Sequence, residues 1–139
     1  KRKIIQKINH PHLQFPALVH PWTAIGHSNI SIGEGSIICA GTIITTDVTI
    51  GKHVILNLSC TVGHDTVIGD FSSFMPTVNI SGEVMIGECV YGGTGAKIIN
   101  LVEIGEETII GAGAVVAKSL PAKCTAVGIP AKPVKLHTD

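Results

Sequence analysis

The chain has 139 residues, enough for one domain, and its ten basic and ten acidic residues give a formal net charge of zero. This balance excludes the strongly basic surface that is typical of proteins that bind nucleic acids or anionic membranes. No apolar run approaches the roughly 18 residues that a membrane-spanning helix needs. We therefore expect a protein that binds neither nucleic acid nor membrane.

The cysteines indicate a reduced compartment. Cys39, Cys60, Cys89 and Cys124 are far apart and form no C-x-x-C pair. Lys1-Arg2-Lys3 leads into no apolar core of a signal peptide. This cysteine usage favours free thiols over a disulfide framework. We expect a cytoplasmic protein.

The N-terminal segment predicts a short helix. Residues 1–9 read KRKIIQKIN, which would put Ile4, Ile5 and Ile8 on one helical face, and Pro11 would block continuation. The abrupt start suggests the last helix of an N-terminal domain that this chain lacks. We expect residues 1–15 to form this helix and a lead-in, and residues 16–139 to form the main domain.

From residue 32 onward the chain repeats with a period of six. Each sixth residue is large and apolar except Gly92, and the residue four places later is small or β-branched. Every third hexapeptide opens with Ile-Gly, as at Ile50-Gly51 and Ile68-Gly69, so the structural unit is three hexapeptides long. The lead-in breaks this phase, because Ile25-Gly26 lies one residue out of step. We expect an irregular first coil there.

A period of six fits neither a helix nor simple strand alternation. It predicts short strands on three flat faces, with stacked triangular coils pairing as parallel strands about 4.8 Å apart. Such a thin prism has a large outer surface. Because only 14% of the residues are charged, part of that surface should be covered by other subunits. A β-sandwich is the alternative, but sandwiches do not keep a constant six-residue phase. The regular coils are expected at 32–49, 50–67, 68–85, 86–103 and 104–121, followed by a short strand at CTAVG and a turn-rich tail.

Several motifs occur in the order found in one enzyme family. They are HPWTAI at 20–25, Asn57, Gly63-His64-Asp65, Ile80-Ser81-Gly82, IGAGAVV at 110–116, and Ala126-Val127-Gly128 followed by Pro130-Ala131-Lys132. Together they resemble bacterial sugar acyltransferases of the sialic-acid O-acetyltransferase and bacillosamine N-acetyltransferase kind. The resemblance implies an all-β fold, a left-handed parallel β-helix, with the left hand known from the family alone, since parallel crossovers are normally right-handed.

The resemblance also implies a catalytic site. Acetyl transfer needs a base for the acceptor's proton and a donor for the developing oxyanion. His64 matches the family's proton acceptor and Asp65 the acidic residue that raises its basicity. Gly82 lies one full coil above His64, where it would leave room for substrate and offer a backbone N–H as oxyanion donor. Asn57 matches a polar position and could orient the acceptor or the histidine. The alternatives are a solvated turn for His64, a turn that needs glycine for Gly82, and coil stabilisation for Asn57.

The same resemblance implies acetyl-CoA as the acetyl donor. Thr94 and Ala112 lie one repeat apart at one corner, with Gly113 beside them, and small residues there would let a pantetheine chain approach the backbone. Ser73 stands where the family has a histidine that contacts acetyl-CoA, and Lys132 could meet CoA phosphates. Corner geometry and solvation are the alternatives.

We therefore expect an acetyltransferase that moves an acetyl group from acetyl-CoA to a sugar, in surface-glycan biosynthesis. N-acetylation of a nucleotide-linked amino sugar is preferred, and O-acetylation of sialic acid or a similar sugar is the alternative. The family resemblance implies a homotrimer with the active site between subunits. Two other classes remain: a carbonic-anhydrase-like metalloenzyme, for which the spacing of His27, His53 and His64 fits poorly, and a non-catalytic assembly platform. We expect no metal site.

Overall fold

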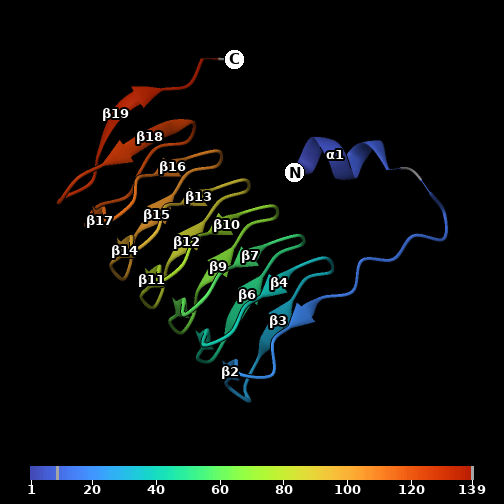
Figure 1. Cartoon of the computed structure of the whole chain (residues 1–139). Helices are drawn as coiled ribbons and strands as arrows, with labels where there is room; N and C mark the ends of the chain where they lie inside the picture. Colours follow the sequence, from blue (N-terminus) through green and yellow to red (C-terminus); the bar gives the residue numbers. More distant parts are fainter. Residues whose placement is uncertain (9, 139) are drawn as a thin grey trace.

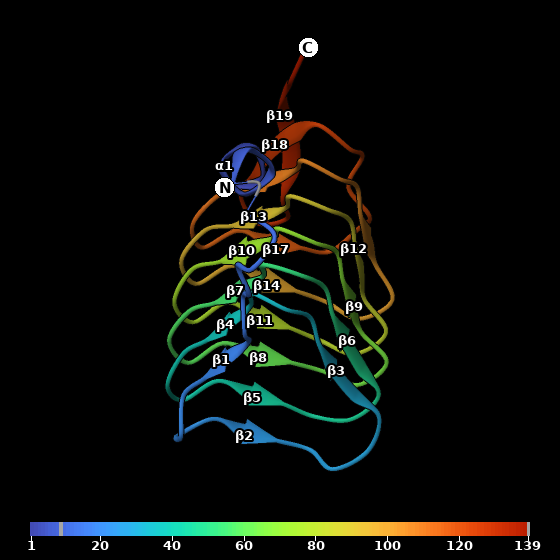
Figure 2. The same ribbon diagram turned by 90° about the vertical axis from the view of Figure 1, so that its right-hand side faces the viewer.

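The computed structural model describes residues 1–8 and 10–138, and it consists of short strands stacked on three faces with one short helix (Figure 1). The expected fold class, an all-β left-handed parallel β-helix with an N-terminal helix, is confirmed. Figure 2 shows the three faces, with β4, β7 and β10 on one, β5, β8 and β11 on the next, and β6, β9 and β12 on the third.

The strands form three sheets. Sheet A contains β1 (Leu18–Val19), β4 (Ile37–Ile38), β7 (Ile55–Leu56), β10 (Ser73–Phe74), β13 (Tyr91–Gly92), β16 (Ile109–Ile110), β18 (Cys124–Val127) and β19 (Lys132–Leu136). Sheet B contains β2 (Ala24–Ile25), β5 (Ile43–Ile44), β8 (Thr61–Val62), β11 (Asn79–Ile80), β14 (Lys97–Ile98) and β17 (Val115–Val116). Sheet C contains β3 (Ile30–Ile32), β6 (Val48–Ile50), β9 (Val67–Ile68), β12 (Met85–Ile86) and β15 (Glu103–Ile104).

Three edges join the sheets, and we name each by the sheets it connects. The A–B edge comprises residues 39–41, 57–59, 75–77, 93–95 and 111–113. The B–C edge comprises residues 45–47, 63–65, 81–83 and 99–101. The C–A edge comprises residues 33–35, 51–53, 69–71, 87–89 and 105–107.

The six-residue series forms the core, as expected. The parallel register pairs residues one repeat apart, such as Ile50 with Ile68, and both side chains are buried. Gly92 is the single break in the apolar series, and packing explains why glycine occupies this position. A β-carbon on Gly92 would lie 2.5 Å from Cδ1 of Phe74, the residue below it in sheet A. The Phe74 ring therefore fills the space that a side chain at Gly92 would take.

Each corner turns through one residue with positive φ. These residues recur at every sixth position from Asn29 to Gly113 without a gap, and most of them are not glycine, for example Asp65 at φ 55°. A left-handed conformation costs roughly 1–2 kcal/mol for a residue with a β-carbon. Repeating it in every coil shows that the backbone ladder and the buried columns together outweigh the local preference.

Both ends of the prism depart from the regular spacing. Ile25 pairs with Ile44, one residue more than a regular coil away, so the expected irregularity of the first coil is confirmed. At the other end Ile109 pairs with Thr125, which shortens the last coil by two positions. The tail also differs from the sequence prediction, because Lys132–Leu136 forms strand β19 rather than a run of turns. It pairs antiparallel with β18 and so covers the last parallel edge of sheet A.

Helix α1 (Arg2–Lys7) is short and lies beside the C–A edge. The Arg2 guanidinium contacts Glu88 at 3.3 Å and Glu107 at 2.9 Å, which belong to successive coils. None of its residues is buried, and Ile4 is 64% exposed, so the apolar face of the helix packs only loosely on the prism. No helix in the described part of the chain is long and apolar enough to cross a membrane.

Candidate active site

His64 and Asp65 form a pair at the tip of the B–C edge, between β8 and β9. The His64 Nδ1 lies 2.8 Å from the Asp65 Oδ2, and the two side chains are 55% and 59% exposed. A carboxylate can only accept a hydrogen bond, so Nδ1 carries the proton that it donates to Asp65. In the neutral imidazole the Nε2 lone pair is then free. The pair therefore presents a base toward the outside of the prism.

The environment of His64 strengthens this base. The hydrogen bond to the Asp65 carboxylate is the main reason why the pKa of His64 is raised above its usual value, and the negative charges of Asp65, Glu83 and Asp47 add to it. These three acids occupy the same corner position in successive coils. Sequence reasoning missed Asp47 and Glu83, although their places one repeat before and one repeat after Asp65 could have identified them.

Gly82 lies directly over the imidazole ring. A β-carbon at this position would lie 2.6 Å from His64 Nε2 and 2.8 Å from Cε1. The stacking expected from the spacing is present, but the space next to Gly82 is filled by the imidazole itself and is not left open for substrate. The Gly82 carbonyl accepts the Leu101 N–H at 3.3 Å, while its own N–H has no hydrogen-bond partner among residues 1–8 and 10–138.

Asn57 lies on a different edge from His64. It follows β7 on the A–B edge, and its Oδ1 accepts the backbone N–H of the next residue, Leu58, at 2.8 Å. No contact joins Asn57 to His64 within the described chain, because strand β8 lies between the two edges. A role for Asn57 in orienting His64 of the same chain therefore has no support in this geometry.

Thr94, Ala112 and Gly113 come together higher on the A–B edge. The Gly113 N–H donates to the Thr94 carbonyl at 2.9 Å, which joins the two coils at this corner. Gly113 has φ +66°, and a β-carbon there would meet nothing within 4 Å. All three residues are exposed. This part of the edge is open and free of bulky side chains.

Ser73 and Lys132 lie apart from that group. Ser73 is on the outer face of sheet A in β10, and its hydroxyl accepts a hydrogen bond from the Lys1 ammonium at 3.2 Å. Lys132 begins β19 in the terminal hairpin and is exposed. The structure thus brings His64 together with Asp65 and Gly82, and Thr94 with Ala112 and Gly113, on two different edges of the prism.

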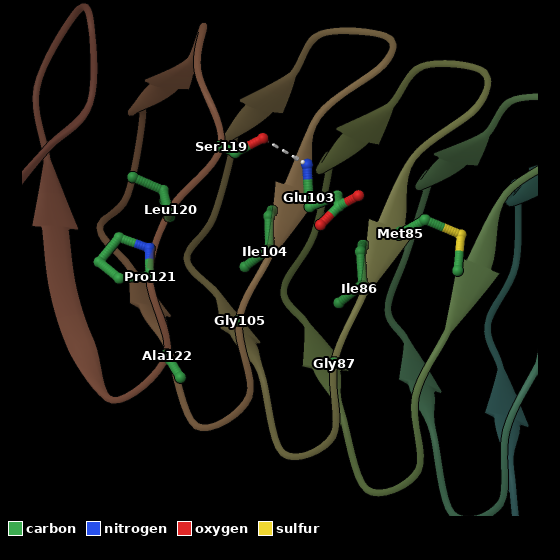
Figure 3. Close-up of a pocket in the computed structure, with 10 residues that line it drawn as sticks. All are labelled: Met85, Ile86, Gly87, Glu103, Ile104, Gly105, Ser119, Leu120, Pro121 and Ala122. Atoms are coloured by element: carbon green, nitrogen blue, oxygen red, sulfur yellow. Dashed lines mark hydrogen bonds between the residues drawn. The ribbon is translucent and has the colours of Figure 1, made fainter.

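A separate hollow lies against sheet C. Its volume is about 530 Å³. Figure 3 shows that Met85, Glu103 and Leu120 are among the residues that line it, over β12 and β15. It forms where the shortened last coil meets sheet C through the single bridge between Ile104 and Leu120. None of the site residues expected from the sequence lines it.

A metal centre finds no support in the described residues. Within residues 1–8 and 10–138 no three His, Cys, Asp or Glu side chains are grouped so that they could hold a metal ion. The carbonic-anhydrase alternative needs three converging histidines. His64 instead has an acid as its near partner.

Known proteins share this fold and part of this sequence. The chain is 39% identical over 122 residues to the GDP-perosamine N-acetyltransferase of Escherichia coli O157:H7, covering 84% of this chain and 54% of that protein. The structure of PerB from Caulobacter crescentus, in complex with CoA and GDP-perosamine, matches with a TM-score of 0.92 and 34% identity over 96% of this chain and 64% of that chain.

The chain is similar in sequence and in fold to hexapeptide-repeat, left-handed β-helix acetyltransferases. WeeI from Acinetobacter baumannii AYE has the same fold, with a TM-score of 0.90 and 37% identity over 96% of this chain. No family model matches the chain. The chain spans about half the length of the E. coli relative and 65% of WeeI.

Proposed function

We propose that this domain transfers an acetyl group from acetyl-CoA to the amino group of a nucleotide-linked sugar. The observation that carries the proposal is the His64–Asp65 pair, which leaves Nε2 as an exposed base on the B–C edge. The similarity to the E. coli GDP-perosamine N-acetyltransferase and to PerB supports the same reaction class.

In this reaction His64 acts as the general base. As the amine nitrogen attacks the thioester carbonyl carbon, Nε2 takes the proton that the nitrogen loses. The carbon–sulfur bond then breaks, and the proton passes from the imidazolium to the sulfur of CoA. Asp65 stabilises the imidazolium that forms in between. The products are the amide and the free thiol.

The charges around His64 favour an amine acceptor. Asp47, Asp65 and Glu83 place three carboxylates on one corner column beside the base, and the charge of each raises the pKa of His64. Such a column attracts an ammonium group and repels a carboxylate. An amino sugar fits this edge better than sialic acid, whose own carboxylate would meet the acidic column.

The acetyl donor would lie along the A–B edge. Stacked coils rise about 4.8 Å each, so Thr94 lies about 8 Å and Ala112 about 13 Å above His64 along the prism. The small residues there, with the open space at Gly113, would admit a pantetheine chain against the backbone. Lys132 in the hairpin and Ser73 on sheet A are the further candidates to contact CoA.

The active site would then need more than one subunit. His64 and the small-residue corner lie on different edges of one prism, so a second copy must supply one of them. The A–B edge has no charged residue in any of its five segments, whereas the C–A edge has at least one in each coil: Glu34, Lys52, Asp70, Glu88 and Glu106. An uncharged edge is suited to burial between subunits. We propose a homotrimer that works in the cytoplasm.

The proposal is tested by measuring thiol release with acetyl-CoA and a panel of UDP-, GDP- and dTDP-linked amino sugars, with free sialic acid as the competing acceptor. Turnover on an amino sugar that is lost in His64→Ala is expected. Equal rates for the wild type and His64→Ala on every acceptor would overturn the proposed function.

A further inference from the structure

We propose that the buried hydroxyl of Thr66 is a positioning group for the reaction at His64. Thr66 would hold the peptide group between Ser81 and Gly82 so that the Gly82 N–H faces outward, where it can donate to the oxygen of the reacting acetyl group. This inference rests on the proposed function and adds a buried residue that does not itself meet the substrate.

Thr66 is a polar exception in a column of valines. The residue that follows each corner of the B–C edge is buried, and in three of these four coils it is a valine: Val48, Val84 and Val102. The coil that carries His64 has a fully buried threonine there instead. Valine has nearly the same shape, so packing alone does not require the hydroxyl, and burying a hydroxyl costs free energy unless it forms a hydrogen bond. A hydrogen-bonding role explains the threonine.

The Thr66 hydroxyl joins the corner of His64 to the corner above it. Its Oγ1 donates to the Ser81 carbonyl at 3.1 Å and lies 3.4 Å from the His64 carbonyl. Because a hydroxyl has a single hydrogen, we assign this hydrogen to the shorter contact. The same oxygen accepts the Val84 N–H at 3.4 Å. The hydroxyl therefore contacts the backbone of two successive coils at this corner.

The bond to Ser81 sets the direction of the Gly82 N–H. The peptide bond between these two residues is trans, and in a trans peptide the C=O and the N–H point in opposite directions. The Ser81 carbonyl points to a fully buried hydroxyl, so the Gly82 N–H points away from the core. Gly63 lets this peptide lie close to the coil below, since a β-carbon on Gly63 would be 2.5 Å from the carbonyl carbon of Ser81.

A corner of the C–A edge has the same arrangement. The Ser36 hydroxyl is buried and donates to the Gly51 carbonyl at 2.8 Å. The N–H of that same peptide belongs to Lys52 and donates to Oδ1 of Asp70, a partly exposed side chain, at 2.7 Å. A buried hydroxyl on the carbonyl thus coincides with an N–H that faces an acceptor outside the core.

The A–B edge repeats this pair of bonds. The Thr42 hydroxyl donates to the Asn57 carbonyl at 3.0 Å, and the Leu58 N–H donates to the Asn57 Oδ1 at 2.8 Å. On both edges a side chain therefore takes the outward N–H. The Gly82 N–H has no such partner within residues 1–8 and 10–138, so a substrate oxygen can take it. It belongs to the corner directly above His64, where an oxyanion donor is expected.

The test compares Thr66→Val, which keeps the shape and removes the hydroxyl, with Thr66→Ser, which keeps the hydroxyl. Thr66→Val should lower kcat by about 10–10²-fold, because a misdirected donor stabilises the oxyanion poorly. Thr66→Ser should restore kcat to within about threefold of wild type. The KM of the amino sugar and the Kd of CoA should stay within about twofold in both variants, because Thr66 is buried beneath the surface that ligands reach.

Thr108→Val is the matched control, since it makes the same substitution on the C–A edge. Thr108 is fully buried, and its Oγ1 donates to the Pro121 carbonyl at 2.6 Å. Thr66→Val and Thr108→Val should lower Tm by similar small amounts, because each removes one buried hydrogen bond. Thr108→Val should nevertheless keep the wild-type kcat.

Two further measurements separate a positioning role from a merely structural one. In two-dimensional NMR spectra the amide resonance of Gly82 should shift in Thr66→Val and stay in place in Thr108→Val. The acidic limb of kcat/KM should not move in Thr66→Val, because the hydrogen bond between His64 and Asp65 remains. A limb that moves would mean that the base is displaced rather than the Gly82 peptide, and an unchanged Gly82 resonance would mean that Thr66 does not orient it. Either result would contradict the inference.

Three kinetic outcomes would also overturn it: a kcat for Thr66→Val within a few-fold of wild type, a Thr66→Ser as slow as Thr66→Val, or an equally slow Thr108→Val. Each of them leaves His64 standing as the base, whereas a fully active His64→Ala would overturn the proposed function itself. If Thr66→Val does not fold, Thr66→Ala removes the same hydroxyl. Alanine is buried at the corresponding positions of the A–B edge, Ala96 and Ala114.

Discussion

Gly82 sits one coil above His64, and the imidazole ring occupies the place where a side chain of Gly82 would be. A β-carbon there would lie 2.6 Å from Nε2, the nitrogen that we propose takes the proton. The glycine therefore sets the position of the base by having no side chain. Its backbone conformation does not require glycine, because its φ is not in the left-handed region.

Gly82→Ala should displace the imidazole and reduce kcat by roughly 10–10²-fold, since small errors in placing a catalytic group are costly. The ring is the end of a mobile side chain, so the fold should survive with little change in Tm. Ser81→Ala, the neighbouring corner residue, is the control and should keep the wild-type kcat. If Gly82→Ala is as active as Ser81→Ala, the ring position seen here does not matter for turnover.

His64→Ala should lower kcat by roughly 10²–10⁴-fold, the usual contribution of a general base. The side chain is exposed, so thermal unfolding and CoA binding should stay close to wild type. Combining His64→Ala with Gly82→Ala should cause no further loss, because both variants act on the same imidazole. Steady-state kinetics and calorimetric CoA titration check both statements.

The pH profile should depend on the acids around His64. As the proposed base, His64 would work in its neutral form, and its raised pKa keeps it protonated to higher pH. The acidic limb of kcat/KM should therefore lie above the usual pKa of histidine. Asp65→Asn removes the largest cause of the shift and should move this limb to lower pH. Asparagine tolerates the left-handed conformation at this position.

Glu83→Gln should move the limb in the same direction by a smaller amount, because Glu83 acts through its charge alone. Glu106→Gln on the C–A edge removes the same charge on a different edge from His64 and is the control for a general change in net charge. A limb that moves equally in all three variants would mean that the carboxylates do not act locally on His64. The measurement is kcat/KM across the range from acidic to mildly alkaline pH at constant ionic strength.

Gly92→Ala should destabilise the prism by about 1–3 kcal/mol, because the added methyl group would meet the Phe74 ring 2.5 Å away in a fully packed core. Replacing the ring as well, in Phe74→Leu with Gly92→Ala, should recover part of this loss. Urea unfolding of the wild type, Gly92→Ala, Phe74→Leu and the double variant measures these changes in the free energy of unfolding. If the double variant is less stable than the sum of the single changes predicts, the smaller side chain at position 74 does not make room for the methyl group at position 92.

The sequence alone predicted the prism, because a strict six-residue period of buried residues is compatible with few arrangements of the backbone. The pairing of Ile50 with Ile68 and the extra residue near Ile25 follow from counting. The hand of the coil and the roles of His64 and Asp65 came from family resemblance. The prediction of a turn-rich tail was wrong: Pro133 in KPVKL argues against a strand, but pairing with β18 at the end of sheet A overrides that preference.

The tertiary structure decided which residues can meet. Counting put Gly82 over His64, but only the side-chain positions revealed that the imidazole fills the space beside that glycine. Motif order grouped Asn57 with His64, whereas the fold puts them on separate edges of the prism. The physical reason is that spacing along the chain fixes the coil and the corner of each residue. The direction of a side chain, and the neighbour it touches, depend on contacts made between coils.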